Sequence, residues 1–183
     1  MIGNNYTHRE YAKKLIIPQR TQPPHIGHIS MLEAACNAAE EVVVGIGSAN
    51  KIGRDNPYSA HERQLMLEKS LDDIGITNCK FVGVPDFESD EEWMDYLKDY
   101  CGLDKDTAIV SGNDYVIGLC DDAGYQTVNP FELVKNPIDI SATRLREMIK
   151  DNHPAWKDYA ATGTKYYFEK FGGRDRIARF YQD

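Results

Sequence analysis

The sequence carries two histidines, His25 and His28, that are separated by Ile26 and Gly27 and follow an apolar stretch at residues 15–17. This spacing places both imidazoles on one side of a helix's first turn, where unpaired backbone N–H groups and the positive dipole end favour an anion. Gly27 has no Cβ, so it lets the anion approach the backbone closely. The natural anion is a nucleotide phosphate, although such a pair also fits metal ligands or chance.

A second segment, residues 140–146 with the sequence Ile-Ser-Ala-Thr-Arg-Leu-Arg, has the chemistry of another anion site. Ser141 and Thr143 are cap-type residues that open a helix whose apolar positions follow 3.6-residue spacing. Arg146 lies one turn further in, and its planar guanidinium can bind phosphate oxygens. Alone, the segment also fits an ordinary capped helix with surface arginines. The two helix starts together predict one triphosphate site.

The elements that must position these residues follow from the hydrophobic pattern. Apolar, strand-like runs alternate with helix-like segments, which is typical of a parallel sheet. We expect strands at residues 14–18, 41–45, 80–84, 107–110 and 126–128. We expect helices after His28, from Ser59 to Gly75, from Ser89, before Gly124 and from Ser141.

We divide the chain into a loose polar arm at residues 1–10, a domain at residues 11–150 and a C-terminal helical extension of that domain at residues 151–183. In the extension, aromatic residues alternate with basic ones. This pattern fits two short helices that pack on the core or form a subunit contact, and it also fits stacking on single-stranded nucleic acid. The acidity of the chain favours the packing interpretation.

Length and charge limit the class of protein. A chain of 183 residues suits one domain, and its net charge of −8 argues against a nucleic-acid partner. A small phosphorylated substrate stays compatible, because arginine, histidine and helix ends make a site locally positive. The four cysteines are scattered without a Cys-x-x-Cys pair, and no apolar run reaches membrane-spanning length. We therefore expect a cytoplasmic protein with no membrane partner.

A series of short motifs follows the chain in a fixed order over residues 11–160. It comprises residues 20–28, 45–49, 56–58 and 62–63, then Pro85-Asp86 ahead of Trp93, and finally residues 111–113 and 140–146. In order and spacing, the series resembles the archaeal-type nicotinamide mononucleotide adenylyltransferases of the H-x-G-H nucleotidyltransferase superfamily. The resemblance implies a Rossmann-like α/β nucleotidyltransferase fold, in which a parallel sheet of five to six strands has helices on both faces.

The resemblance implies adenylyl transfer, in which the 5′-phosphate of nicotinamide mononucleotide (NMN) attacks the α-phosphorus of ATP and gives NAD and pyrophosphate. The substrate phosphate is already ionised, so the protein needs no nucleophile of its own. It must hold two polyanions in line and stabilise the charge on the pyrophosphate. Mg²⁺, held by the phosphates rather than by protein side chains, would share that task. Such relatives are often oligomeric, so a homo-oligomer is a possible assembly.

The resemblance also implies the role of individual residues. The catalytic set, which binds the ATP phosphates, is His25, His28 and Arg146. The further ATP-binding set is Arg20, Thr21, Gly27, Ser111, Asn113, Ile140, Ser141 and Thr143. The mononucleotide-binding set is Gly47, Ser48, Arg63, Asp90 and Trp93. Trp93 would stack on the nicotinamide ring, although its helix can also bury it in the core, and Arg63 fits a surface ion pair as well.

The chain departs from the family pattern at three positions. Gln19 and Thr21 stand where the family commonly has glycine and phenylalanine, so the backbone there must differ or draw back. Asp90 stands where relatives can carry an asparagine that faces the carboxamide. A carboxylate accepts from an amide but repels a nicotinate, which predicts a preference for the amide substrate. Asp90 also fits an acidic residue that serves only its helix N-terminus.

Other classes of protein fit less well. Class I aminoacyl-tRNA synthetases have a late lysine-rich loop, P-loop ATPases have a G-x-x-x-x-G-K motif, and the chain has neither. The pair Gly45-x-Gly47 lacks the third glycine of a dinucleotide-binding dehydrogenase. Two alternatives stay open: a sister transferase that acts on phosphopantetheine, FMN or glycerol phosphate, and a non-catalytic nucleotide sensor. Retention of His25, His28 and Arg146 speaks against the sensor.

Overall fold

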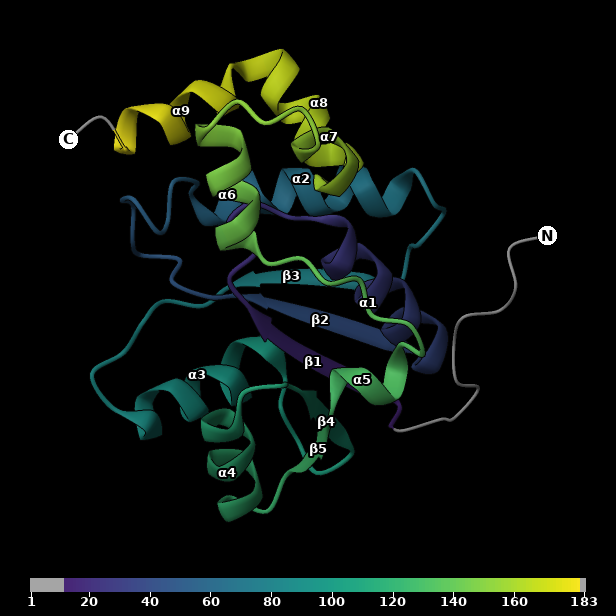
Figure 1. Cartoon of the computed structure of the whole chain (residues 1–183). Helices are drawn as coiled ribbons and strands as arrows, with labels where there is room; N and C mark the ends of the chain where they lie inside the picture. The colour runs from purple at the N-terminus through teal and green to yellow at the C-terminus, as the bar shows by residue number, and fades with distance from the viewer. Residues whose placement is uncertain (1–11, 182–183) are drawn as a thin grey trace.

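The computed structural model describes residues 12–181 and contains a parallel sheet with the strand order β3-β2-β1-β4-β5 (Figure 1). The predicted arm at residues 1–10 lies outside the described residues. The strands are β1 (Lys14–Gln19), β2 (Glu41–Ile46), β3 (Cys79–Gly83), β4 (Thr107–Val110) and β5 (Gln126–Val128). All five predicted strands are present within about one residue of their expected bounds. The strand order reverses between β1 and β4, and open α/β sheets bind ligands beyond the carboxyl ends at that point.

Nine helices follow in the described part of the chain. They are α1 (Ile26–Ala38), α2 (Ala60–Asp72), α3 (Asp90–Cys101), α4 (Asp114–Asp122), α5 (Pro130–Leu133), α6 (Ala142–Lys150), α7 (Trp156–Tyr159), α8 (Thr162–Phe171) and α9 (Gly173–Phe180). Ser59, Ser89 and Ser141 cap α2, α3 and α6, as the sequence predicts. None of the described helices is both long enough and apolar enough to cross a membrane.

Helices cover both faces of the sheet. The residues of β1 explain why the strands have unbroken apolar sequences. Leu15 and Ile17 point into a core that α1, α2 and α5 close. Ile16, between them, points to the other face and packs with residues of α3 and α4. A strand buried on both faces needs an apolar residue at every position. The predicted α/β fold with helices on both faces is confirmed.

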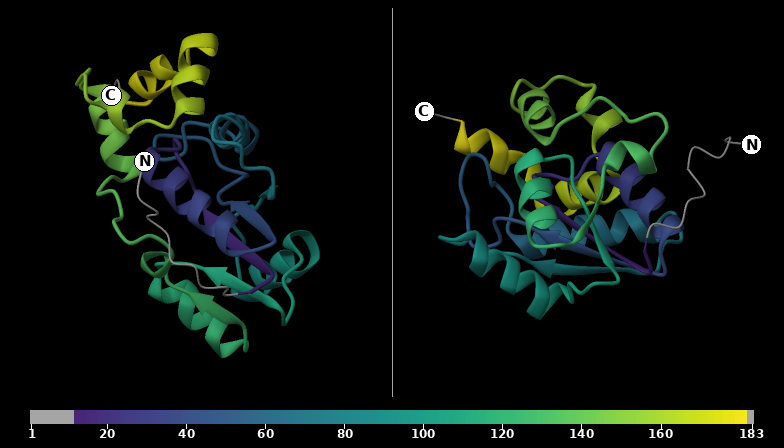
Figure 2. Two further views of the ribbon diagram at one scale, coloured as in Figure 1. Left: turned by 90° about the vertical axis from the view of Figure 1, so that its right-hand side faces the viewer. Right: turned by 90° about the horizontal axis from the view of Figure 1, so that it is seen from below.

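The C-terminal helices form a third layer at the end of the molecule opposite α3 and α4 (Figure 2). They pack on α2 and α6 around a core that includes Trp156, Phe168 and Ile177. The backbones of α8 and α2 approach so closely that a Cβ on Gly163 would lie 1.9 Å from the carbonyl oxygen of Met66. The expected packing on the core is confirmed, but with three helices instead of two, because residues 156–159 add a short one.

Candidate functional site

His25 and His28 hold each other in place at the start of α1. The backbone N–H of His28 donates to Nδ1 of His25, and the backbone N–H of His25 donates to Nδ1 of His28, each over 3.2 Å. The two rings stack with their centroids 3.6 Å apart. Because each Nδ1 accepts a hydrogen bond, we assign the proton of each neutral ring to Nε2. The pair therefore presents two Nε2–H donors.

The histidine pair is neutral at physiological pH. Burial lowers the pKa of His25 to about 4. Burial and the nearby His25 lower the pKa of His28 well below its ordinary value. Both rings therefore act as hydrogen-bond donors rather than as cations. Residue 27 has little room for a side chain, because a Cβ there would lie 3.1 Å from Nδ1 of His25 and 3.4 Å from the side chain of Ile140, and these side chains would have to move aside.

The second predicted helix start lies directly against the first. Ile140 comes next to Gly27, and Nη1 of Arg146 donates to the backbone oxygen of Gln22 over 2.8 Å. Arg146 is buried, so the alternative of a surface arginine does not hold for it. Its Nη2 donates to Oγ1 of Thr143 over 3.3 Å and pairs with Asp55 over 3.4 Å. The two segments thus converge, as the sequence predicts.

A cavity of about 300 Å³ lies beside the histidines. Three of its lining residues are His25, Gly27 and His28, which bring polar groups to one end. Most of the remaining wall is apolar and comes from α1 and from residues 130–140, namely Met31, Pro130, Phe131, Val134, Pro137, Ile138 and Ile140. An apolar slot next to convergent donors fits a flat base that carries an anionic group.

A second cavity, of about 480 Å³, lies beyond the carboxyl ends of β1 and β2. It brings together six predicted residues, namely Arg20, Gly47, Ser48, Asp90, Trp93 and Asn113. Trp93 also packs against the core under α3, so both interpretations of this residue apply. The sequence assigned Asn113 to ATP, whereas it lies in the wall of the tryptophan cavity. Ser111 lines neither cavity within the described residues; its Oγ accepts from the N–H of Asn113 over 3.1 Å.

On the wall of the larger cavity, Ser48, Lys51 and Asp86 form a cluster of polar contacts. The sequence places Asp86 in the motif series but assigns no role to it. Asp86 accepts from Oγ of Ser48 over 3.0 Å and pairs with Lys51 over 2.6 Å. The hydrogen bond from Lys51 contributes most to lowering the pKa of Asp86. Ser48 adopts a left-handed backbone conformation, with φ at 50°. The place of Asp86 after the third strand is the signal that was available, because ligands bind at such strand ends.

Arg63 holds the backbone of three residues that line the larger cavity. Its side chain is fully buried and donates to four backbone carbonyls, those of Ser59, Arg20, Gly47 and Ser48. Burial lowers its pKa to about 10. The alternative of a surface ion pair is therefore wrong, and Arg63, which was assigned to the mononucleotide, does not itself line the larger cavity. Arg63 ties the loops after β1 and β2 together, and those loops form the wall that lines the cavity.

Asp90 is the first residue of α3 and lies on the rim of the larger cavity. Its Oδ2 accepts a hydrogen bond from the hydroxyl of Tyr115, and this bond is the main cause of the raised pKa of Tyr115. Within the described part of the chain, Oδ1 of Asp90 makes no hydrogen bond. Ser89 caps the helix and Asp90 is an acidic residue of its first turn, so the alternative that Asp90 serves the helix N-terminus stays open. Asp90 is exposed, so its carboxylate is open to the cavity that it lines.

The sheet order, the cavities at the strand ends and the converging helix starts define a nucleotidyltransferase. Residues 20–148 match the cytidylyltransferase-like family, and the chain belongs to this family. It is 34% identical to the nicotinamide-nucleotide adenylyltransferase of Aeropyrum pernix, a match that covers 91% of this chain and 96% of that protein. It is 33% identical to the enzyme of the same name from Methanococcus aeolicus, over 91% and 94% of the two chains. The predicted resemblance is confirmed.

Among solved structures, the chain is similar to a bifunctional NMN adenylyltransferase/ADP-ribose pyrophosphatase from Francisella tularensis, which was crystallised with AMP and a manganese ion. The TM-score is 0.73 at 21% sequence identity, and the match covers 91% of this chain. This chain spans only about half of that longer protein, at 52%. At this identity the likeness supports the fold.

Proposed function

We propose that the protein is an adenylyltransferase that transfers AMP from ATP to nicotinamide mononucleotide, with NAD and pyrophosphate as products. The names of its relatives support this reaction, and so does the pairing of two cavities. The cavity beside His25 and His28 suits the adenine and phosphates of ATP. The cavity beside Trp93 suits a second nucleotide whose base is flat. The sheet edge between them is where the two phosphates would meet.

One observation carries the proposal: the unsatisfied buried polar atoms gather at this edge. Among residues 12–181, the buried side-chain atoms without a hydrogen-bond partner are Nε2 of Gln19, Oγ1 of Thr21, Oδ1 of Asn56 and Nε of Arg146. Gln19 is the last residue of β1, and Thr21 lies two residues beyond it. Asn56 follows Asp55, which pairs with Arg146. Leaving such groups unpaired costs about 1–3 kcal/mol each. A polar ligand that supplies their partners removes this cost.

The chemistry of these residues fits phosphoryl chemistry without a protein nucleophile. The Nε2–H groups of His25 and His28 would donate to ATP phosphate oxygens, and the guanidinium of Arg146 would stabilise the leaving pyrophosphate. Preorganised donors of this kind stabilise charge that develops in the transition state. Thr21, buried and with φ at 46°, has a free hydroxyl for the same ligand. The protein's share of catalysis is therefore positioning and charge stabilisation.

We propose Mg²⁺ as the metal and the ATP phosphates as its ligands. The side chains that converge on the phosphate position are imidazole N–H and guanidinium donors. Mg²⁺ prefers oxygen ligands and keeps several waters, so these donors complement the phosphates rather than the metal. When bound, the metal would neutralise part of the phosphate charge.

For the second nucleotide, we propose the amide NMN rather than its acid counterpart. Trp93 offers an aromatic face to the ring, and Oδ1 of Asp90 is available to accept from a carboxamide N–H₂. A nicotinate in that position would bring two carboxylates together. All four cysteines are free thiols in the structure, which fits the reducing cytoplasm that we propose as the compartment.

The test is pyrophosphate release from Mg·ATP by the purified protein when each acceptor is added alone. We expect release with NMN, less with nicotinic acid mononucleotide, and none with FMN or phosphopantetheine. Release only with another acceptor would assign the protein to a sister transferase. ATP binding without release for any acceptor would make it a nucleotide sensor.

A further inference from the structure

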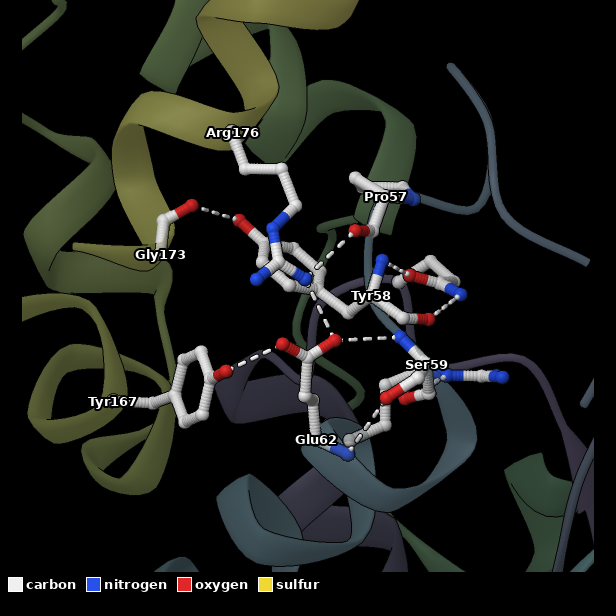
Figure 3. A network of polar contacts seen from close by, with 9 residues as sticks. Pro57, Tyr58, Ser59, Glu62, Tyr167, Gly173 and Arg176 are labelled. Atoms are coloured by element: carbon white, nitrogen blue, oxygen red, sulfur yellow. Dashed lines mark hydrogen bonds and ion pairs between the residues drawn. The ribbon is translucent and has the colours of Figure 1, made fainter. Parts of the chain in front are cut away.

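A half-buried carboxylate, that of Glu62, joins α2 to the C-terminal helices (Figure 3). Glu62 closes the capping box of α2, where its Oε2 accepts the N–H of Ser59 over 2.8 Å. The same oxygen pairs with Nη1 of Arg176 on α9 over 2.7 Å. Its other oxygen accepts the hydroxyl of Tyr167 on α8. One side chain from the core domain thus binds two helices of the C-terminal layer.

Helices α8 and α9 also contact the loop that precedes α2. Nη1 of Arg176 also donates to the backbone oxygen of Pro57 over 3.3 Å. The hydroxyl of Tyr58 donates to the backbone oxygen of Gly173 over 2.9 Å, and the Tyr58 side chain is fully buried among the rings of α8. Residues 57–58 are therefore held from α8 and α9 by two polar contacts and a packed ring, and the two polar contacts can be followed in Figure 3.

From this loop, a short path leads to Arg146. The side-chain amide of Gln22 pairs with the backbone of Tyr58 in both directions: Nε2 donates over 2.7 Å, and Oε1 accepts over 3.1 Å. The backbone oxygen of the same Gln22 accepts from Nη1 of Arg146 over 2.8 Å. Asp55, from the same loop, is the other contact of Arg146 outside α6. The contact to Gln22 thus belongs to a segment that the C-terminal helices hold through Tyr58, and Asp55 lies two residues before Pro57, which Arg176 contacts.

We propose that Glu62, Tyr167 and Arg176 are positioning residues that fix the Arg146 guanidinium for the ATP phosphates by way of Tyr58 and Gln22. In the described structure, none of the first three lines either cavity of the site, so they act through other residues. The ion pair between Glu62 and Arg176 is partly exposed, and such a pair is weak evidence for stability, because solvent screening and desolvation offset its attraction. What such a pair does supply here is a defined geometry. The inference rests on the proposed function only in treating ATP as the ligand of Arg146.

The test compares two arginines on the same helix. Arg176→Gln removes the contacts to Glu62 and Pro57, whereas Arg179→Gln removes the same charge from an exposed side chain of α9. We measure the Kd of Mg·ATP by calorimetry and check the fold by thermal unfolding. We expect Arg176→Gln to weaken ATP binding by about tenfold while NMN binding is unchanged. Arg179→Gln should match the wild type, and Arg176→Lys should recover part of the loss.

A double-mutant cycle separates positioning from general loosening. In an Arg146→Lys background the fork that Gln22 holds is already gone, so adding Arg176→Gln should weaken ATP binding by less than about twofold. An equal loss in both backgrounds, or no loss in either, would overturn the inference. If Arg176→Gln does not fold, Tyr58→Phe removes the bond to Gly173 alone and takes its place in the cycle. A wild-type protein that binds no ATP would instead refute the proposed function.

Discussion

His25 has two roles that one substitution can separate. Its Nδ1 accepts the N–H of His28 and caps α1, while its Nε2–H is the donor proposed for ATP. Asparagine is among the best N-cap residues, and its Oδ1 can take the place of Nδ1. We therefore expect His25→Asn to change the free energy of unfolding by less than about 0.5 kcal/mol. His25→Ala removes the cap as well and should cost about 1 kcal/mol.

Catalysis should respond differently from folding. Both variants lack the Nε2–H, and the loss of one preorganised donor lowers kcat by about 10²–10³, or about 2.7–4 kcal/mol in the barrier. The assay is pyrophosphate release at saturating Mg·ATP and NMN, run beside thermal unfolding of each variant. The exposed His61 supplies the control, because His61→Asn makes the same change outside the site. We expect His61→Asn to match the wild type in both measurements.

Two results would refute this reasoning. The first is a kcat for His25→Asn within about threefold of the wild type, which would show that Nε2–H contributes little. The second is a loss of kcat in step with the loss of folding stability across both variants. The histidine would then be no more than a cap.

Three further predictions concern pH and specificity. The pKa of His25 is lowered to about 4, and the pKa of His28 is also well below its ordinary value. The pH profile of kcat/KM for ATP should therefore show no break near pH 6.5. A break near that pH that disappears in His25→Asn would contradict this prediction. Burial alone would raise the pKa of Glu62, but bonds from its partners outweigh it and lower the pKa to about 2. The carboxylate therefore stabilises the fold above pH 4.5, and this stabilisation fades as the pH falls toward 2. Urea unfolding should show Glu62→Gln costing about 2 kcal/mol at pH 7 and clearly less at pH 3, and a constant cost would count against the assignment. Asp90→Asn should raise kcat/KM for nicotinic acid mononucleotide relative to NMN by about tenfold, whereas an unchanged ratio would mean that Asp90 serves only its helix.

The sequence predicted the parts of the fold that local pattern encodes. The apolar run before His25 and the capping residues Ser59 and Ser141 gave strand and helix positions close to those observed. The convergence of His25 and Arg146 was also predictable, because two anion-binding helix starts serve one ligand only if they meet. These predictions needed only the neighbours of each residue along the chain.

Other features depend on partners that are distant in the sequence. Arg63 looks like a surface arginine, but its partners are backbone carbonyls, which leave no mark in residue types. The resemblance assigns Asn113 to ATP, but nothing in the sequence says which face of the sheet α4 covers and therefore which cavity Asn113 lines. It covers the face of α3, which brings Asn113 to the cavity of Trp93. The contact between Gln22 and Tyr58 is equally invisible, because it joins a side-chain amide to a backbone.

The crossing of α8 over α2 has a consequence for how this protein tolerates change. At Gly163 there is no space even for a methyl group, because Met66 lies directly beneath. Alanine at that position would push α8 away from α2, and the side chain of Tyr167 one turn later would move with it. A library that randomises residue 163 should therefore return glycine alone.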